Sequence, residues 1–182
     1  MPKATDMLRE DHKKVKGLFE QFEHAESDEK KQLVATTLQE LEIHTTLEEE
    51  IFYPAAQEAL QDNSEEEDTI DEAWEEHHVV KLVAAELKKM RSSDERYDAK
   101  FTVLAESVKH HIEEEENELF PKLESHIDGE ELGKKMMARK QKLQQTDNGS
   151  KKSSRSKSRT ASNRGKAKKR MQKRRSASGG RR

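Results

Sequence analysis

Two stretches of the chain decide the fold: LEIHTTLEEEIFYP at residues 41–54 and SVKHHIEEEENELFP at residues 107–121. Aligned on their prolines, they place His44 opposite His111 and Glu48 opposite Glu115. In each stretch the glutamate follows the histidine by four residues, so the two side chains share one face of a helix. One such helix could be a solvated charged surface, whereas two in the same register indicate two halves of one site.

The two helical segments without this pattern form a second repeat. Apolar residues follow His12 at the third, sixth, seventh and tenth positions, and they follow His77 at the same offsets. This register favours His77 over its neighbour His78 as the inward histidine. The proline alignment in the same way favours His111 over His110.

Apolar spacing near 3.6 residues predicts four long helices, separated by short polar joints. Their expected ranges are about 7–22, 30–52, 68–90 and 94–120. Long helices joined by short loops pack antiparallel, so we expect an all-α, up-down-up-down four-helix bundle. Pro54 and Pro121 are each predicted to end or kink a helix, because proline lacks a backbone donor. A short fifth helix is expected from Asp128.

The charge of the chain is divided very unevenly. Residues 146–182 hold 15 Lys or Arg and one acid, whereas the first 145 residues hold 20 basic and 37 acidic residues. A segment with so few apolar residues and so much like charge cannot bury enough surface to offset the entropy of ordering, which predicts a disordered basic tail. We therefore divide the chain into a bundle (1–127), a short helix (128–145) and this tail (146–182).

Dense positive charge without aromatic residues indicates contact with the phosphates of DNA or RNA, without sequence preference. A tail that folds back onto the acidic bundle is the alternative. The candidate nucleic-acid-binding residues are Lys151, Lys152, Arg155, Lys157, Arg159, Arg164, Lys166, Lys168, Lys169, Arg170, Lys173, Arg174 and Arg175.

Cysteine is absent, which excludes disulfides and thiolate metal ligands. No apolar run approaches the roughly 18–20 residues that span a bilayer, and the N-terminus has no secretory signal pattern. We expect a cytoplasmic protein without a membrane partner, associated with the nucleoid if the tail binds DNA.

If every repeat faces inward, four imidazoles and two carboxylates meet near the bundle axis. Burying such groups unpaired would cost several kcal/mol each, and a pair of metal ions removes that cost. Mixed histidine and carboxylate ligation is typical of non-haem iron, although zinc and manganese accept the same donors. An acidic bundle with purely structural histidines is the simpler alternative.

The motifs DH at 11–12, HxxxEEExxxP at 44–54, EEH at 75–77 and HxxxEExxxxP at 111–121 resemble the hemerythrin-type HHE cation-binding domain. This resemblance covers roughly residues 4–125 and implies two iron ions, oxo- or hydroxo-bridged when oxidised. It also implies dioxygen, peroxide or NO as the small ligand. The ligands that it implies are His12, His44, Glu48, His77, His111 and Glu115, with the two glutamates as bridges.

The sequence departs from oxygen-carrying hemerythrins on the third helix, where a second histidine ligand is missing. Ala73 and Lys81 occupy the positions four residues before and after His77. One iron would then have a vacancy, or a substitute ligand such as water or one of three nearby glutamates, Glu49, Glu76 and Glu116. An open iron suits reaction better than reversible oxygen carriage. Asp11 and Glu76 are candidates for orienting ligand imidazoles, although ordinary helix surface explains them equally well.

The sequence therefore predicts a di-iron protein that binds or reacts with O2, peroxide or NO, tethered to nucleic acid by its tail. Two alternatives stay open. The first is a nucleic-acid-associated protein that senses or stores iron with little turnover. The second is metal-dependent chemistry on DNA, such as nicking.

Overall fold

The structure is a computed structural model, and it describes residues 2–60 and 64–146. Two compact units divide the chain, residues 1–140 and residues 141–182. In the second unit, residues 141–146 are described, and they are helical. All regular structure in the described ranges is helical, which confirms the predicted all-α class.

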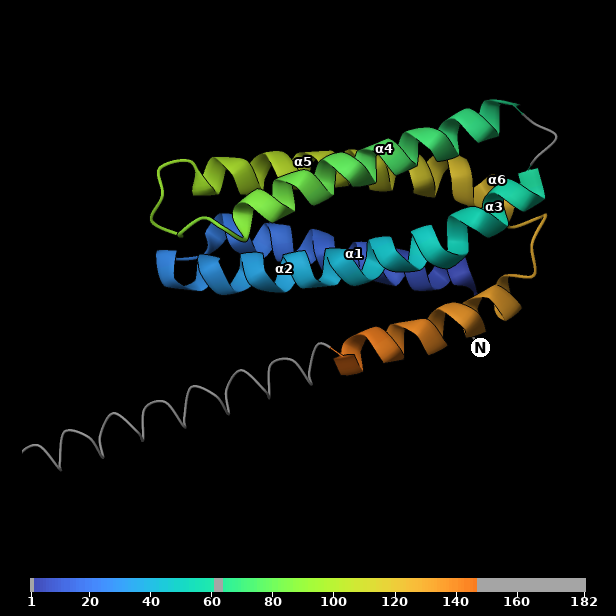
Figure 1. Cartoon of the computed structure of the whole chain (residues 1–182), viewed down its shortest axis with the longest axis horizontal. Coiled ribbons are helices and arrows are strands. Elements are labelled where there is room, and N and C mark those ends of the chain that lie inside the picture. Colours follow the sequence, from blue (N-terminus) through green and yellow to red (C-terminus); the bar gives the residue numbers. More distant parts are fainter. Residues whose placement is uncertain (1, 61–63, 147–182) are drawn as a thin grey trace, which may run out of the picture. The chain divides into compact units, whose positions relative to one another are not determined.

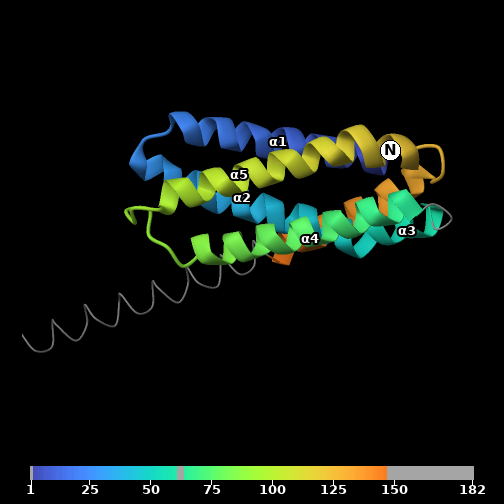
Figure 2. The ribbon, with the colours of Figure 1, turned by 90° about the horizontal axis from the view of Figure 1, so that it is seen from above.

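Four long helices build the first unit: α1 (Ala4–His24), α2 (Ser27–Leu47), α4 (Ser64–Leu87) and α5 (Tyr97–Glu114). Neighbours in the chain run antiparallel, and α5 lies beside α1 (Figures 1 and 2). The predicted up-down-up-down bundle is confirmed. Among the described residues, no helix is both long and apolar enough to cross a bilayer.

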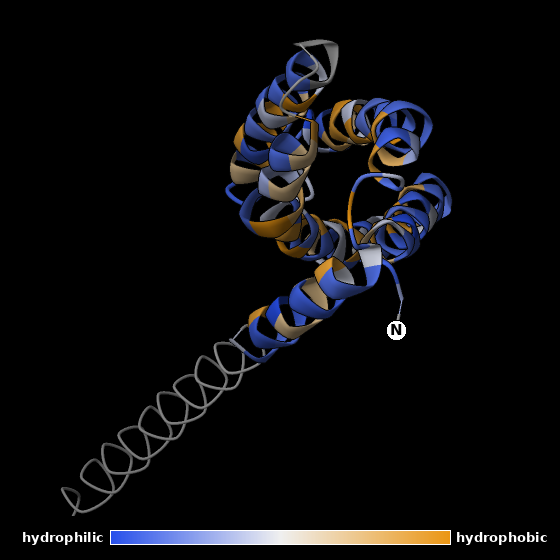
Figure 3. Cartoon of the chain, turned by 90° about the vertical axis from the view of Figure 1, so that its right-hand side faces the viewer, coloured by the Kyte–Doolittle hydropathy of each residue, from blue (hydrophilic) through white to orange (hydrophobic). Residues whose placement is uncertain are grey.

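Hydrophobic side chains fill the interior between these helices. Seen end-on, hydrophobic residues lie where the helices face one another, and most outward faces are hydrophilic (Figure 3). Phe19, Phe22 and Phe101 pack together, with ring centroids 4.3 Å apart for Phe22 and Phe101 and 5.8 Å apart for Phe19 and Phe101. This aromatic cluster fixes the half of the bundle that lies away from the prolines.

The two prolines, each predicted to end or kink a helix, follow π-helical turns. Neither proline ends the helical path: a π-helical turn, η1 (Glu48–Phe52), leads into α3 (Tyr53–Leu60). Likewise η2 (Glu115–Leu119) leads into α6 (Phe120–Leu123). Tyr53 and Phe120 donate their backbone N–H groups to the carbonyls five residues earlier, those of Glu48 and Glu115. This wider turn lets the chain pass a proline, which can neither donate to nor lie close to the carbonyl four residues before it.

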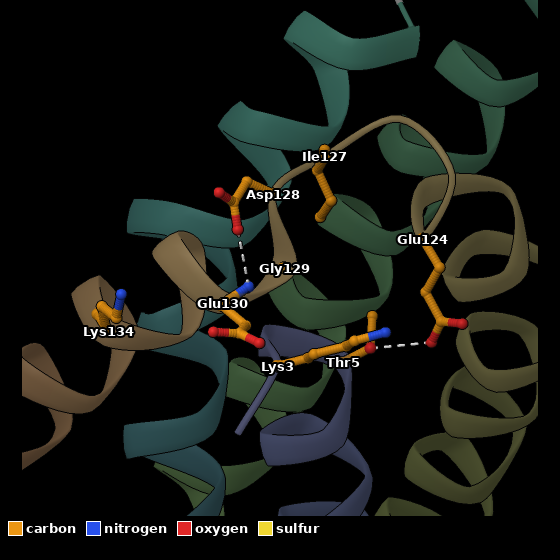
Figure 4. Close-up of a pocket in the computed structure, with 8 residues that line it drawn as sticks. All are labelled: Lys3, Thr5, Glu124, Ile127, Asp128, Gly129, Glu130 and Lys134. Carbon is orange, nitrogen blue, oxygen red and sulfur yellow. Dashed lines mark hydrogen bonds between the residues drawn. The ribbon is translucent and has the colours of Figure 1, made fainter. Parts of the chain in front are cut away.

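A further helix covers residues 129–140 of the first unit. Its start is capped by Asp128, whose Oδ1 accepts the N–H groups of Glu130 and Glu131 at 3.1 and 3.0 Å. Figure 4 shows this cap beside Thr5 and Glu124, around a pocket of about 310 Å³. We call residues 129–140 the C-terminal helix. The predicted disordered tail lies outside the described residues, except for Thr146.

Candidate metal centre

The structure brings the six candidate ligands of the bundle together at the π-turns. Each long helix contributes one histidine, and Glu48 and Glu115 are the first residues of η1 and η2. None of the six is more than 4% exposed. His78 and His110, the alternatives to His77 and His111, are exposed.

The two glutamates lie between two pairs of histidines. Glu48 Oε1 lies 3.1 Å from Nε2 of His44, and its Oε2 lies 3.3 Å from Nε2 of His77. Glu115 Oε2 lies 3.2 Å from Nε2 of His12 and 3.6 Å from Nε2 of His111. Each carboxylate therefore joins one histidine of α1 or α2 to one of α4 or α5, as a carboxylate bridging two cations would.

Donor atoms that could hold a cation form two groups in this centre. The first contains His12, His44, Glu48 and Glu115, and the second contains Glu48, His77 and His111. All ligand atoms within a group lie within 4.8 Å of one another. Because Glu48 belongs to both groups, the geometry supports two neighbouring cations better than two unrelated sites.

Each histidine turns its other ring nitrogen, Nδ1, toward a carboxylate outside the centre. The distances are 2.7 Å for His12 to Glu116, 3.0 Å for His77 to Glu49, 2.7 Å for His111 to Glu76 and 3.9 Å for His44 to Asp11. A partner at hydrogen-bond distance, as for His12, His77 and His111, fixes the tautomer of a metal-binding imidazole, so that Nε2 is free to coordinate.

This arrangement places Glu49 and Glu116 against Nδ1 of His77 and His12. All three residues that were predicted as possible substitute ligands, Glu49, Glu76 and Glu116, contact the Nδ1 atoms of histidines on the outside of the centre. The role considered for Glu76 and Asp11 matches their positions beside His111 and His44.

Tyr53 is a component of the centre that the sequence reasoning did not identify. Its hydroxyl donates to Oε1 of Glu115 at 2.9 Å and lies 3.3 Å from Nε2 of His77 and 3.4 Å from Nε2 of His111. In the proline alignment Tyr53 matches Phe120, whose ring stacks on His12 at a centroid distance of 5.8 Å. The alignment could have revealed this difference, since one repeat carries a hydroxyl where the other has none.

Several buried donor atoms in the centre have no hydrogen bond within the described part of the chain. They are Nε2 of His12, both ring nitrogens of His44, both oxygens of Glu48 and Oε2 of Glu115. A buried polar atom without a partner costs about 1–3 kcal/mol, and more for a charged group. Most of these atoms lie at ion-pair distance from one another but not in hydrogen-bonding geometry, so the donor set fits metal ions placed between them.

Protons replace the cations in the metal-free centre. Burial lowers the pKa of His44, but the carboxylates of Glu48, Asp11 and Glu115 outweigh it and raise that pKa to about 10. The pKa of His111 is lowered by burial and raised more strongly by Glu115, Glu76 and Glu48, to about 9. Burial raises the pKa of Glu48, yet His44 and His77 hold it well below its usual value.

The void that the described residues leave at the centre is small. A void of about 10 Å³ touches all four histidines, and aliphatic residues close it. The larger pocket in Figure 4 lies among other residues and contains none of the six candidate ligands. The thirteen basic tail residues proposed to bind nucleic acid lie outside the described residues.

These features define a helical-bundle protein with a buried histidine and carboxylate metal centre. Residues 3–123 match the hemerythrin HHE cation binding domain. The chain belongs to this family, whose domain binds metal ions.

Individual relatives agree with this assignment. An uncharacterized hemerythrin-like protein of Schizosaccharomyces pombe is 27% identical over 136 residues, covering 72% of this chain and 64% of the relative. A protein of Nostoc sp. named DNA nickase is 24% identical over 144 residues, covering 77% of this chain and 40% of the relative. The chain thus spans less than two thirds of the length of either curated relative.

A solved structure shows the same fold. It is the crystal structure of a hemerythrin HHE cation binding domain-containing protein from Mycobacterium kansasii. It superimposes with a TM-score of 0.67 at 28% identity, covering 80% of this chain and 90% of that one.

Proposed function

We propose that the chain holds a pair of iron ions in this centre and uses them to bind or react with dioxygen, peroxide or nitric oxide. The observation that carries the proposal is the pair of donor groups that share Glu48 and leave buried donor atoms unpaired. Nitrogen and carboxylate donors without thiolate suit non-haem iron, whose open positions admit a small ligand.

The positions of the six residues suggest which ion each would bind. His12 and His44 would hold one ion, His77 and His111 the other, and Glu48 with Glu115 would keep the two close. Bound iron supplies the electrons for reduction of the small ligand. The chain excludes bulk water by burying the centre, and it holds the imidazoles of His12, His77 and His111 through a carboxylate at Nδ1.

The centre is asymmetric, which favours reaction over reversible carriage. Ala73 supplies no ligand on α4, and the phenol oxygen of Tyr53 is the donor beside His77 and His111 that could take the open position. Phe120 offers no such oxygen beside His12. The two ions would therefore have different surroundings.

Metal analysis of the full chain, purified with and without air, tests the proposal. We expect about two irons per chain, as in other two-metal sites, and near-ultraviolet absorption of the oxidised pair that changes on adding peroxide or NO. His44→Ala should lower the iron content, whereas the exposed His78→Ala should not. A preparation that retains zinc or manganese but never iron would refute the iron assignment.

Two alternative functions involve nucleic acid. The protein could sense or store iron while bound to DNA through its tail, with little turnover. The relative named DNA nickase favours a link to DNA strand cleavage. However, the burial of the candidate ligands keeps a phosphodiester from contacting the metals directly. Incubating the iron-loaded chain with supercoiled plasmid separates the two, since only a nicking protein produces relaxed circles.

A further inference from the structure

One of the four central imidazoles is held differently from the others. His12, His77 and His111 each have a carboxylate oxygen within 2.7–3.0 Å of Nδ1. For His44, the corresponding oxygen is Oδ2 of Asp11, and it lies 3.9 Å from Nδ1. Nδ1 of His44 is buried and has no hydrogen bond among the described residues. The carboxylate of Asp11 thus lies near the imidazole of His44 but does not form a hydrogen bond with it.

A lysine from outside the family domain contacts the same carboxylate. Nζ of Lys140 donates to both oxygens of Asp11, with 2.7 Å to Oδ2, the same atom that faces His44. Lys140 lies in the C-terminal helix, beyond the residues 3–123 that match the family. Its ammonium and the imidazole of His44 therefore compete for one carboxylate.

Independent contacts fix the C-terminal helix in this position. Arg139 donates from Nε and Nη2 to the two oxygens of Glu50, at 2.5 and 2.8 Å. Leu132 and Met136 are buried on its inner face. Gly133 approaches the N-terminal backbone so closely that an added Cβ would lie 2.4 Å from the carbonyl oxygen of Pro2. Lys140 thus reaches Asp11 as part of a docked helix.

A second lysine shows that an ion pair with lysine does not by itself separate a carboxylate from its histidine. Lys81 donates to both oxygens of Glu49, yet Glu49 still contacts Nδ1 of His77 at 3.0 Å. Lys81 lies on α4, one turn after His77, so it and the histidine share one element. Lys140 lies on a different element from both Asp11 and His44, so docking of that element can change the contact.

We propose that Lys140 is a positioning residue that holds Asp11 away from His44, and that the docked C-terminal helix thereby weakens His44 as a metal ligand. This inference rests on the metal binding proposed above. When the helix leaves, Asp11 closes on Nδ1 of His44 and makes the imidazole a stronger donor, because a carboxylate at Nδ1 increases the basicity of a ligating histidine. The C-terminal helix would then tune how tightly the bundle holds metal.

Zinc binding to the full chain, measured by competition with a chelator at fixed pH, tests the inference without redox chemistry. Outer carboxylates change metal affinity by about 10–100-fold. We expect Lys140→Met to lower the dissociation constant of the weaker-bound zinc about 10-fold. Lys135→Met is the matched control, since Lys135 lies on the same helix and pairs with Glu131 across one turn. This control should leave the affinity unchanged.

Two additional variants distinguish positioning from general support of the fold. Adding Asp11→Asn to Lys140→Met should remove the gain in affinity, whereas Asp11→Asn alone should have a smaller effect. The 15N chemical shift of His44 Nδ1 in the zinc form should move toward that of a hydrogen-bonded ring in Lys140→Met. Equal or weaker zinc binding by Lys140→Met would overturn the inference. If the unmodified chain binds no zinc or iron, the proposed function itself fails, and this inference with it.

Discussion

At the residue scale, the central imidazoles exchange protons for metal, and this exchange fixes how the centre responds to pH. Glu48 and Glu115 are buried beside four histidines, so positive charge must remain nearby. Without metal, raised pKa values keep His44 and His111 protonated near neutral pH. A cation that binds at Nε2 must displace these protons, because only neutral imidazole coordinates.

Metal uptake should therefore release protons and strengthen as pH rises. With pKa values of about 10 for His44 and about 9 for His111, both carry a proton at pH 7. We expect the release of about two protons per chain on zinc binding at pH 7, falling below about one near pH 10. Calorimetry in buffers of different ionisation enthalpy measures this number. Proton release that does not change between pH 7 and pH 10 would contradict the raised pKa values.

The same pKa values predict how the stability of the metal-free chain depends on pH. Because the folded-state pKa of His44 lies above the ordinary 6.5, its contribution is fully present below pH 6.5 and is lost as pH rises toward about 10. The contribution of Glu48, whose folded pKa is lowered, is present above 4.5 and is lost in acid. Urea unfolding of chelator-treated protein should show falling stability from pH 7 to pH 10. Zinc-loaded protein should lose much less, since its histidines are already neutral.

Tyr53 decides whether one ion differs from the other. If the phenol oxygen binds iron, the oxidised protein should show a tyrosinate-to-iron band in the visible region. Tyr53→Phe should then remove the band while most of the iron stays, because six other donors remain. Phe120→Tyr is the matched variant, since it places a phenol at the equivalent position beside His12. If the visible band survives in Tyr53→Phe, Tyr53 does not bind iron and acts as a hydrogen-bond donor to Glu115.

At the scale of single elements, the π-turns explain why the ligands of two helices converge. Each turn begins at a candidate ligand, Glu48 or Glu115. The carbonyl of that glutamate accepts a hydrogen bond from the backbone N–H of the aromatic residue before the proline, Tyr53 or Phe120. A π-turn adds one residue to the helix path, which changes the face that the following side chains share. Tyr53 and Phe120 consequently face the centre, together with glutamates five positions before them.

The C-terminal helix depends on a glycine in a way that α1 does not. A Cβ at Gly133 would lie 2.4 Å from the backbone oxygen of Pro2, whereas one at Gly17 would have nothing within 4 Å. We expect Gly133→Ala to loosen residues 129–140, seen as faster amide hydrogen exchange there, with the bundle intact. Gly17→Ala should instead stabilise the chain by roughly 0.5–1 kcal/mol, because Gly17 lies inside α1 and alanine favours helix. Equal exchange in both variants would argue against close packing at Gly133.

At the scale of the whole molecule, the sequence predicts what depends on repetition and misses what depends on a single contact. Two repeats of histidine spacing were enough to select the buried His77 and His111 over their exposed neighbours. The π-turns were missed because a shift of one hydrogen bond leaves the apolar periodicity nearly unchanged. The contact of Lys140 with Asp11 joins residues 129 positions apart, and no local pattern encodes it.

The basic tail differs from the rest of the chain in its charge. It carries 15 Lys or Arg against one acid, while the first 145 residues carry an excess of 17 negative charges. If the tail binds phosphates, removing residues 147–182 should abolish binding of duplex DNA at 50 mM salt. In the full chain, affinity should fall about 10³–10⁵-fold between 50 and 200 mM salt if six to ten phosphates are contacted.

A tail variant with its serines changed to alanine is the matched control, since it keeps every positive charge and should bind DNA as the full chain does. If the acidic bundle competes with DNA for the tail, the isolated peptide 147–182 should bind more tightly than the full chain. Intermolecular binding then has to exceed the attraction within the chain, which weakens with salt in the same way. DNA affinity that is unchanged by removal of the tail would place any nucleic-acid contact on the bundle, and the tether would be wrong.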